Sequence, residues 1–290
     1  PVSETMGEIL EILNLIQRND VPLLVVPVEA IMQCVMPRGE LNNQTFSINK
    51  GESVEREFLE ACLIDNGFVR IPMVENHGEF SVRGDIIDIY PPASPNPLRI
   101  EFFDNTIESI REFDVNSQVS LKVIKKLDIL PVREVSPSPE QKEAGLEKIW
   151  QMARELGSDT VGLKELTDKI QHLDNFVGIE HLAPFFYSRR ETLFDYLSED
   201  AVVVFDEEDS VLSKIDHFQE LITTEYVSAC NRGDVVAPPN RFYLDLNEIK
   251  SRLAEKQIIS INTLNTESNG GPKNIRFDIT SNPTFHGKFE

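Results

Sequence analysis

The segment GSDTVGLK, from Gly157 to Lys164, nearly matches the phosphate-binding loop G-x-x-x-x-G-K-[ST] but differs at the last two positions. In that loop the lysine contacts the phosphates of a nucleotide, and the hydroxyl that follows it binds Mg²⁺. Leu163 stands here at the lysine position and Lys164 at the hydroxyl position, and the preceding residues have the pattern of a helix instead of a strand. Because both functional groups are displaced, we expect no nucleotide to bind at this segment.

The acidic segment FDEED, from Phe205 to Asp209, follows an apolar run, which is where a nucleoside triphosphatase carries the acids that hold Mg²⁺. Asp206 would be the first of these acids. The alternative is that the carboxylates are solvated and favour the start of the following helix, where the helix dipole attracts negative charge. Since no phosphate loop accompanies them, we favour the second interpretation.

The histidines and cysteines lack the spacing of metal sites or nucleophiles, because no H-E-x-x-H, C-x-x-C or G-x-S-x-G motif occurs. We therefore expect no catalytic, cofactor-binding or metal-binding residue in this chain. No disulfide pattern is indicated and no run of eighteen apolar residues exists, so we expect a cytoplasmic protein without a membrane segment. The residues concerned are His77, His172, His181, His217, His286, Cys34, Cys62 and Cys230.

Two further segments, EFSVRGDIIDIY and LRIEFF, each predict one strand, and their side chains are sorted by the alternation of a strand. One side of each strand is apolar, which predicts a core face. The opposite side should then point toward solvent. The residues predicted to face the core are Phe80, Val82, Leu98, Ile100 and Phe102.

Arg83, Arg99 and Phe103 are placed by the same alternation on the outer side of these strands. Arginine and large aromatic side chains are enriched at the hot spots of protein interfaces, so the three residues could form a docking site. The alternative is that another element covers Phe103 and that the arginines form exposed ion pairs with Glu101 or Asp104, which contribute at most about 1 kcal/mol. The pattern alone leaves both interpretations open.

The segments described above belong to two kinds of predicted structure, one α/β and one α+β. A chain of 290 residues with 40% apolar content is long enough for two domains. The runs VPLLVVPV and AVVVF predict buried parallel strands of an α/β domain. Between them, strands separated by turn residues predict a small α+β domain with an antiparallel sheet and one helix. The predicted parts are an α/β domain over 1–39 and 133–262, an inserted α+β domain over 40–132, and a tail over 263–290.

The formal net charge of the chain is −21. A surface this acidic repels phosphate backbones over most of its area, so we do not expect bare DNA or RNA to be the main ligand. The acidity also favours solubility.

The segment GEFSVRGDIIDIYPPASPNPLRIEFFDNTIESIREFDVNSQVS resembles a segment of bacterial transcription-repair coupling factors that reads GEFAVRGGILDIFPP and then RIEFFDDEIESIR. Two later stretches, GIEHLAPFFY followed by TLFDYL and then APPNRFYLD, are similar to the same family and come in the same order. The resemblance runs from Val21 to about Asp245. The related domain of UvrB, an excision-repair helicase, is the alternative because it shares Asp85, but the phosphate loop and tyrosine-rich hairpin of UvrB are missing.

The resemblance implies that the inserted domain docks UvrA and that the flanking α/β region is a degenerate, RecA-like domain without ATPase ability. In the family two arginines and a phenylalanine carry the docking surface, and they match Arg83, Arg99 and Phe103. The chain would then be a non-catalytic interaction region that recruits UvrA. A UvrB-like ATPase fragment that uses Asp206 for Mg²⁺ is the alternative.

The resemblance also implies properties of the full-length protein. It would be an ATP-dependent DNA translocase, with ATP and Mg²⁺ in its motor domains, that displaces stalled RNA polymerase from double-stranded DNA and brings UvrA to the lesion. In the family a C-terminal domain masks the docking surface at rest. The motor domains would lie outside these 290 residues.

Overall fold

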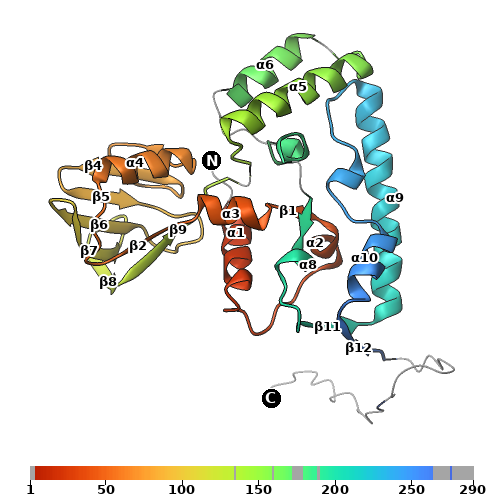
Figure 1. The fold of residues 1–290 in the computed structure, drawn as a ribbon, viewed down its shortest axis with the longest axis horizontal. Coiled ribbons are helices and arrows are strands. Elements are labelled where there is room, and N and C mark those ends of the chain that lie inside the picture. The colour runs from red at the N-terminus through yellow and green to blue at the C-terminus, as the bar shows by residue number, and fades with distance from the viewer. Residues whose placement is uncertain are drawn as a thin grey trace, which may run out of the picture.

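A computed structural model of the chain describes residues 4–133, 135–158, 160–171, 179–187, 190–263 and 275. The predicted tail over 263–290 lies outside the described residues except at positions 263 and 275. Figure 1 shows a domain rich in strands at the left and a larger, mostly helical part at the right. Among the described residues, no helix has the length and apolar character needed to span a membrane.

The strand-rich part, from β2 to β9 and here called the β-rich domain, is built on a six-stranded sheet in the order β3-β4-β5-β6-β7-β8. Neighbouring strands are antiparallel, except that β3 and β4 are parallel. This arrangement agrees with the predicted antiparallel sheet. The strands are β3 (Val69–Arg70), β4 (Glu79–Arg83), β5 (Ile86–Ile89), β6 (Leu98–Phe103), β7 (Thr106–Phe113) and β8 (Ser120–Ile124).

The prediction that EFSVRGDIIDIY forms one strand was wrong, because a tight turn divides this segment into β4 and β5. Arg83 pairs with Ile86 across the turn, and Gly84 and Asp85 form the two-residue loop. Gly84 has a φ of +59°, a conformation that two-residue hairpin turns need and that glycine adopts without strain. Asp85 is therefore a turn residue and not part of the outer face of a strand.

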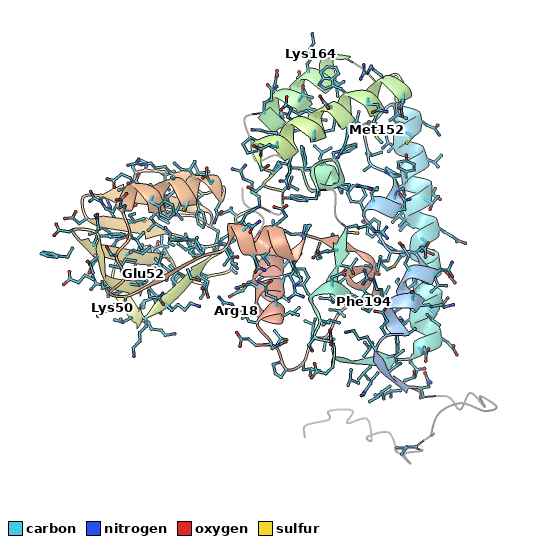
Figure 2. All side chains as sticks on the ribbon, viewed as in Figure 1. Arg18, Lys50, Glu52, Met152, Lys164 and Phe194 are labelled. Atoms are coloured by element: carbon cyan, nitrogen blue, oxygen red, sulfur yellow. The ribbon has the colours of Figure 1, made fainter. Side chains whose placement is uncertain are left out.

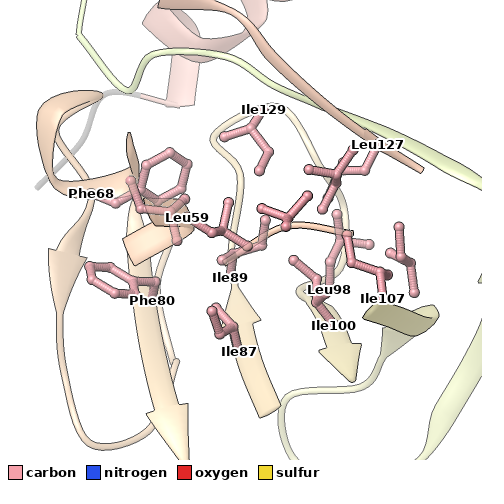
Figure 3. Packing of buried hydrophobic residues seen from close by; sticks show 14 of the residues in the cluster. Leu59, Phe68, Phe80, Ile87, Ile89, Leu98, Ile100, Ile107, Leu127 and Ile129 are labelled. Carbon is pink, nitrogen blue, oxygen red and sulfur yellow. The ribbon is translucent and has the colours of Figure 1, made fainter. Parts of the chain in front are cut away.

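One helix and one strand pair close over a single face of the sheet. Helix α4 (Arg56–Asp65) is followed by Gly67, which has a positive φ of +88°, the conformation that glycine often adopts just after a helix. Strand β2 (Phe46–Asn49) pairs antiparallel with β9 (Lys126–Ile129). Figure 3 shows the apolar side chains packed between these elements. They include Leu59, Phe68, Phe80, Ile87, Ile89, Leu98, Ile100, Ile107, Leu127 and Ile129.

The helical part contains three apolar clusters, each shared by several helices. One joins α5, α6 and α7, the second joins α2, α8, α9, α10 and β11, and the third joins α1, α3 and α8. The elements are α1 (Glu4–Gln17), α2 (Val28–Met32), β1 (Cys34–Val35), α3 (Arg38–Gln44), α5 (Pro139–Leu156), α6 (Thr160–Gln171), η1 (Ile179–Leu182), α7 (Ala183–Phe186), β10 (Glu191–Thr192), α8 (Leu193–Tyr196), β11 (Val202–Asp206), α9 (Glu208–Arg232), η2 (Pro239–Arg241), α10 (Leu246–Leu253) and β12 (Gln257–Ile261).

The prediction of a buried parallel strand over VPLLVVPV was wrong. Residues 21–27 of the described chain form no strand, and Leu23 and Val25 are 79% and 87% exposed. Pro22 and Pro27 each remove a backbone donor that a central strand would need. The apolar composition of this run therefore does not place it inside a sheet.

The second predicted strand, AVVVF, does form as β11 and pairs in parallel with β12. Its burial is only partial, because Phe205 lies in an apolar cluster while Val202 and Val204 are exposed. Together with the β-rich domain, this establishes a mixed α/β fold with an antiparallel sheet. The more specific assignment of a degenerate RecA-like domain stays a prediction.

Two contacts hold α1 against the β-rich domain. Near the start of the helix Gly7 approaches Pro92 so closely that a Cβ on residue 7 would overlap the proline. Beyond the end of the helix Arg18, labelled in Figure 2, donates a hydrogen bond of 2.5 Å to Asp128 of β9. Because these residues lie toward opposite ends of α1, the helix is fixed along its length.

Candidate functional site

The three residues predicted to form an interface lie on the face of the six-stranded sheet that is opposite α4, here called the outer face. On β6, Ile100 and Phe102 are buried in the core, and Arg99 and Phe103 alternate with them. Arg83 ends β4, next to the turn. Phe103 is 71% exposed.

Asp88 of β5 lies in the middle of the outer face and contacts both arginines. Its side chain is only 1% exposed. It accepts a hydrogen bond of 2.7 Å from Nη2 of Arg83, and two from Arg99, at 2.7 Å from Nε and 2.8 Å from Nη2. A carboxylate that is buried to this degree is stabilised by the two cations and holds both in a defined position.

Arg99 is the more constrained of the two arginines. Its guanidinium group stacks over the ring of Phe113, 4.4 Å from the ring centre, and Nη2 also donates to Oε1 of Gln118 at 2.9 Å. The hydrogen bond to Asp88 raises the pKa of Arg99; burial lowers it by less, and the charges of Asp88 and Glu101 raise it further. Arg99 is therefore cationic over the whole accessible pH range.

Glu101 and Arg111 form a second ion pair on the outer face. Ser109 also donates a hydrogen bond of 2.7 Å to Glu101. The sequence analysis considered Glu101 as an ion-pair partner of Arg83 or Arg99. In the structure both arginines instead form ion pairs with Asp88. Glu101 stands between Arg99 and Phe103 along β6, so the exposed ring lies beside the charged cluster and not between the two arginines.

Asp88 is the residue of this candidate site that sequence reasoning missed. On the single strand that was predicted, alternation from Phe80 and Val82 would have placed Asp88 on the core face; the turn shifts the alternation by one residue, so that Ile87 and Ile89 are buried and Asp88 is on the outer face. The two-residue turn at Gly84 was the signal that β5 begins at Ile86 and runs beside β6. With that turn recognised, the pairing of Asp88 with Arg99 could have been predicted.

The segment that resembles a phosphate loop connects two helices. Gly157 follows α5 in the left-handed conformation of a helix cap, with a φ of +66°. Leu163 is buried on α6 in the apolar cluster with α5, and Lys164 is exposed on the same helix. The leucine at the lysine position is thus a core residue.

The acids of FDEED lie where β11 passes into α9, and they contact the end of β12. Glu208 and Asp209 are in the first turn of α9, as the second interpretation predicted. Glu207 accepts a hydrogen bond from the Thr263 hydroxyl and another, of 2.7 Å, from the Thr263 backbone N–H, and these lower the pKa of Glu207, the hydroxyl more than the backbone. Within the described residues, no three histidine, cysteine or acidic side chains are grouped as a metal site would need.

Comparison with known proteins gives the class of the β-rich domain. Residues 46–134 match the UvrB interaction domain family. The matched range begins at the first residue of β2 and ends shortly after β9, so it includes the whole sheet, α4 and the outer-face cluster.

The chain as a whole is similar to transcription-repair-coupling factors. It is 31% identical over 235 residues to that of Bacillus subtilis (strain 168), 29% over 263 residues to that of Myxococcus xanthus, and 28% over 264 residues to that of Escherichia coli (strain K12). These matches cover 77%, 89% and 88% of this chain. The resemblance to this family that the motifs indicated is confirmed.

The same matches cover 19%, 22% and 22% of the three relatives. The chain therefore spans about a fifth of the length of the curated relatives that it matches.

Proposed function

We propose that this chain is the UvrA-recruiting region of a transcription-repair coupling factor, and that UvrA docks on the outer face of the β-rich domain. The observation that carries this proposal is the pair of arginines held by buried Asp88 beside an exposed phenylalanine, inside a range that matches the UvrB interaction domain. Arg83, Arg99 and Phe103 are the proposed contact residues.

The geometry suits an acidic partner surface with an apolar pocket. Arg83 uses one guanidinium nitrogen for Asp88, and about half of its side chain, 48%, stays exposed for a partner carboxylate. Asp88 and Phe113 fix the orientation of Arg99 before binding, which lowers the entropy lost on association. Phe103 supplies an apolar anchor that a partner can bury.

The proposal extends to the longer protein of which this chain would be a part. That protein would be an ATP-dependent DNA translocase of the cytoplasm that acts on RNA polymerase stalled on double-stranded DNA. ATP and Mg²⁺ would bind in other domains, and the present chain would act as a docking region without catalysis or cofactor. The net charge of −21 is consistent with a protein partner instead of DNA for this region.

Titration calorimetry with purified UvrA tests the docking site. We expect the unsubstituted chain to bind, and Arg83→Ala, Arg99→Ala and Phe103→Ala each to lose about 2 kcal/mol or more of binding free energy. Two matched controls lie on the α4 side of the same domain: Arg70, which pairs with Glu60 of α4, and the exposed ring of Phe58. Arg70→Ala and Phe58→Ala should bind UvrA as the unsubstituted chain does.

Circular dichroism and thermal unfolding of each variant separate a lost contact from a lost fold. Absence of UvrA binding by the unsubstituted chain would contradict the proposed function. Unchanged affinity in all three alanine variants would reject the site.

A further inference from the structure

The outer face continues beyond the two arginines to the edge of the sheet. Direct cross-strand pairs connect Ser81 to Asp88, Asp88 to Arg99, Arg99 to Arg111, and Arg111 to Val123. Paired residues point to the same side of a sheet, so this row crosses from β4 to β8 on one face. Val123 lies two strands beyond Arg99, roughly 10 Å away.

The β8 end of the row is apolar and exposed. Val123 is 61% exposed, and Leu121, in the irregular part of the β7–β8 pairing, is also exposed. Single exposed apolar residues are common on monomers, but here two occur in the last strand of the sheet, and Val123 is in line with a preorganised charged cluster.

The two edges of the sheet differ in charge. At the opposite edge, Val69 of β3 also stands on the outer face, paired with Glu79, and is 54% exposed. Val123, in contrast, is paired with Arg111, while the neighbouring Lys122 is paired with Glu112, 3.9 Å away, on the opposite face. Because a cation stands beside Val123 and a carboxylate beside Val69, an acidic partner is favoured on the β8 side of the outer face over the β3 side.

The size of a stable interface favours a site larger than three residues. A standard interface buries about 800 Å² and 20–30 residues on each partner. Arg83, Arg99 and Phe103 can supply the centre of such a site but not its area. The neighbouring surface that continues both its cationic and its apolar character is the part of the outer face over β7 and β8.

We propose that the docking surface extends across β7 to the edge strand β8, that Val123, with Leu121 on the same strand, forms a second apolar contact apart from Phe103, and that UvrA is the occupant. This inference rests on the proposed function and adds a direction to it: the acidic partner surface covers the β8 edge and leaves the β3 edge uncovered. Arg111, paired with Glu101, lies under the middle of the contact.

The test compares two valines in matched positions on the two edges. Val123→Glu and Val69→Glu each place a carboxylate on an exposed edge strand of the outer face. Titration with UvrA should give a dissociation constant at least about tenfold higher for Val123→Glu, as for a hot-spot residue, and a change of less than about twofold for Val69→Glu. Val123→Thr keeps the shape and strand preference of valine, so it should fold in any case and weaken binding to a smaller, measurable extent.

Phe103→Ala, measured beside them, separates this inference from the proposed function. If Phe103→Ala weakens binding while Val123→Glu and Val123→Thr bind as the unsubstituted chain does, the extension is wrong and the docking site stands. Equal losses of affinity for Val69→Glu and Val123→Glu would also overturn the extension, because binding would then not distinguish the β8 edge from the β3 edge. No binding by the unsubstituted chain would reject both.

Discussion

Asp88 lies directly opposite Arg99 in the pairing of β5 with β6, and the two side chains are joined by two hydrogen bonds of 2.7 and 2.8 Å. Arg83 reaches the same carboxylate from the next strand. The outer face is thus organised around a buried anion that is not itself available to a partner. The anion determines where the two cations can point.

Replacement of Asp88 should reduce stability strongly. Asp88→Asn keeps the size of the side chain but leaves Arg99 and Arg83 without a carboxylate, and loss of one member of a buried ion pair costs about 3 kcal/mol. Urea unfolding measures the free energy of unfolding. Asp85→Asn is the matched control, because Asp85 is 72% exposed and pairs with Arg56, so its loss should cost less than about 1 kcal/mol. Equal losses in both variants would show that Asp88 does not organise the site.

Asp128 should make the stability of the protein depend on acid pH. Burial alone would raise its pKa, but hydrogen bonds from Arg18, Ser47 and Lys126 and the charge of Arg18 outweigh burial and lower the pKa to about 2. Since the folded pKa is below the unfolded value of about 4, Asp128 contributes stability that is fully present above pH 4 and is lost as the pH falls toward 2.

The measurement is chemical unfolding of the unsubstituted chain and Asp128→Asn at a series of pH values. The difference in unfolding free energy between them should be constant from pH 7 to about pH 5 and should shrink between pH 4 and pH 2. A difference that does not change with pH would contradict the role of the Asp128 charge.

The close approach of α1 to the β-rich domain should make Gly7 intolerant of a side chain. Gly7→Ala adds a methyl group that would overlap Pro92, and overpacking of this kind costs about 1–3 kcal/mol. Gly39→Ala, in α3, is the control because no atom lies within 4 Å of its added Cβ. Thermal unfolding should show a lower midpoint temperature for Gly7→Ala than for the unsubstituted chain. The midpoint of Gly39→Ala should not be lowered in this way. The reverse order would mean that α1 is not packed on Pro92.

Cys34 should react slowly with thiol reagents. Burial raises the pKa of its thiol to about 12, so almost none of the reactive thiolate is present at pH 8. Burial also raises the pKa of Cys62, with a further contribution from Asp65, but Cys62 is more accessible. Alkylation at pH 8 followed by peptide mass mapping should label Cys62 before Cys34. In urea the two should react at similar rates, and equal rates in the native protein would be inconsistent with a protected Cys34.

The outer face was the part of the site that sequence could predict, because alternation along antiparallel strands is a local rule. Once Ile100 and Phe102 are assigned to the core, Arg99 and Phe103 must point outward. The partner of Arg99 was not predicted, since it depends on which strand lies beside β6. That depends in turn on the turn at Gly84, which was read as the interior of a strand.

The helical part was less predictable, because the local sequence of an apolar run does not determine which other segment it pairs or packs with. VPLLVVPV has the composition of a buried strand, yet Leu23 and Val25 are exposed and two prolines remove backbone donors. AVVVF forms a strand because β12, about fifty residues later, lies beside it. Pairing over such a distance is a property of the whole chain.

Strands β2 and β9 bring the chain into and out of the β-rich domain side by side, with Phe46 paired to Ile129 and Asn49 to Lys126. The entry and exit of the domain are therefore neighbouring positions, about 5 Å apart. Removal or replacement of a unit attached in this way leaves the chain of its host continuous, and the contacts of α1 with Pro92 and Asp128 are the ones that would be lost. The outer face and the helical part that carries it can then change independently during evolution.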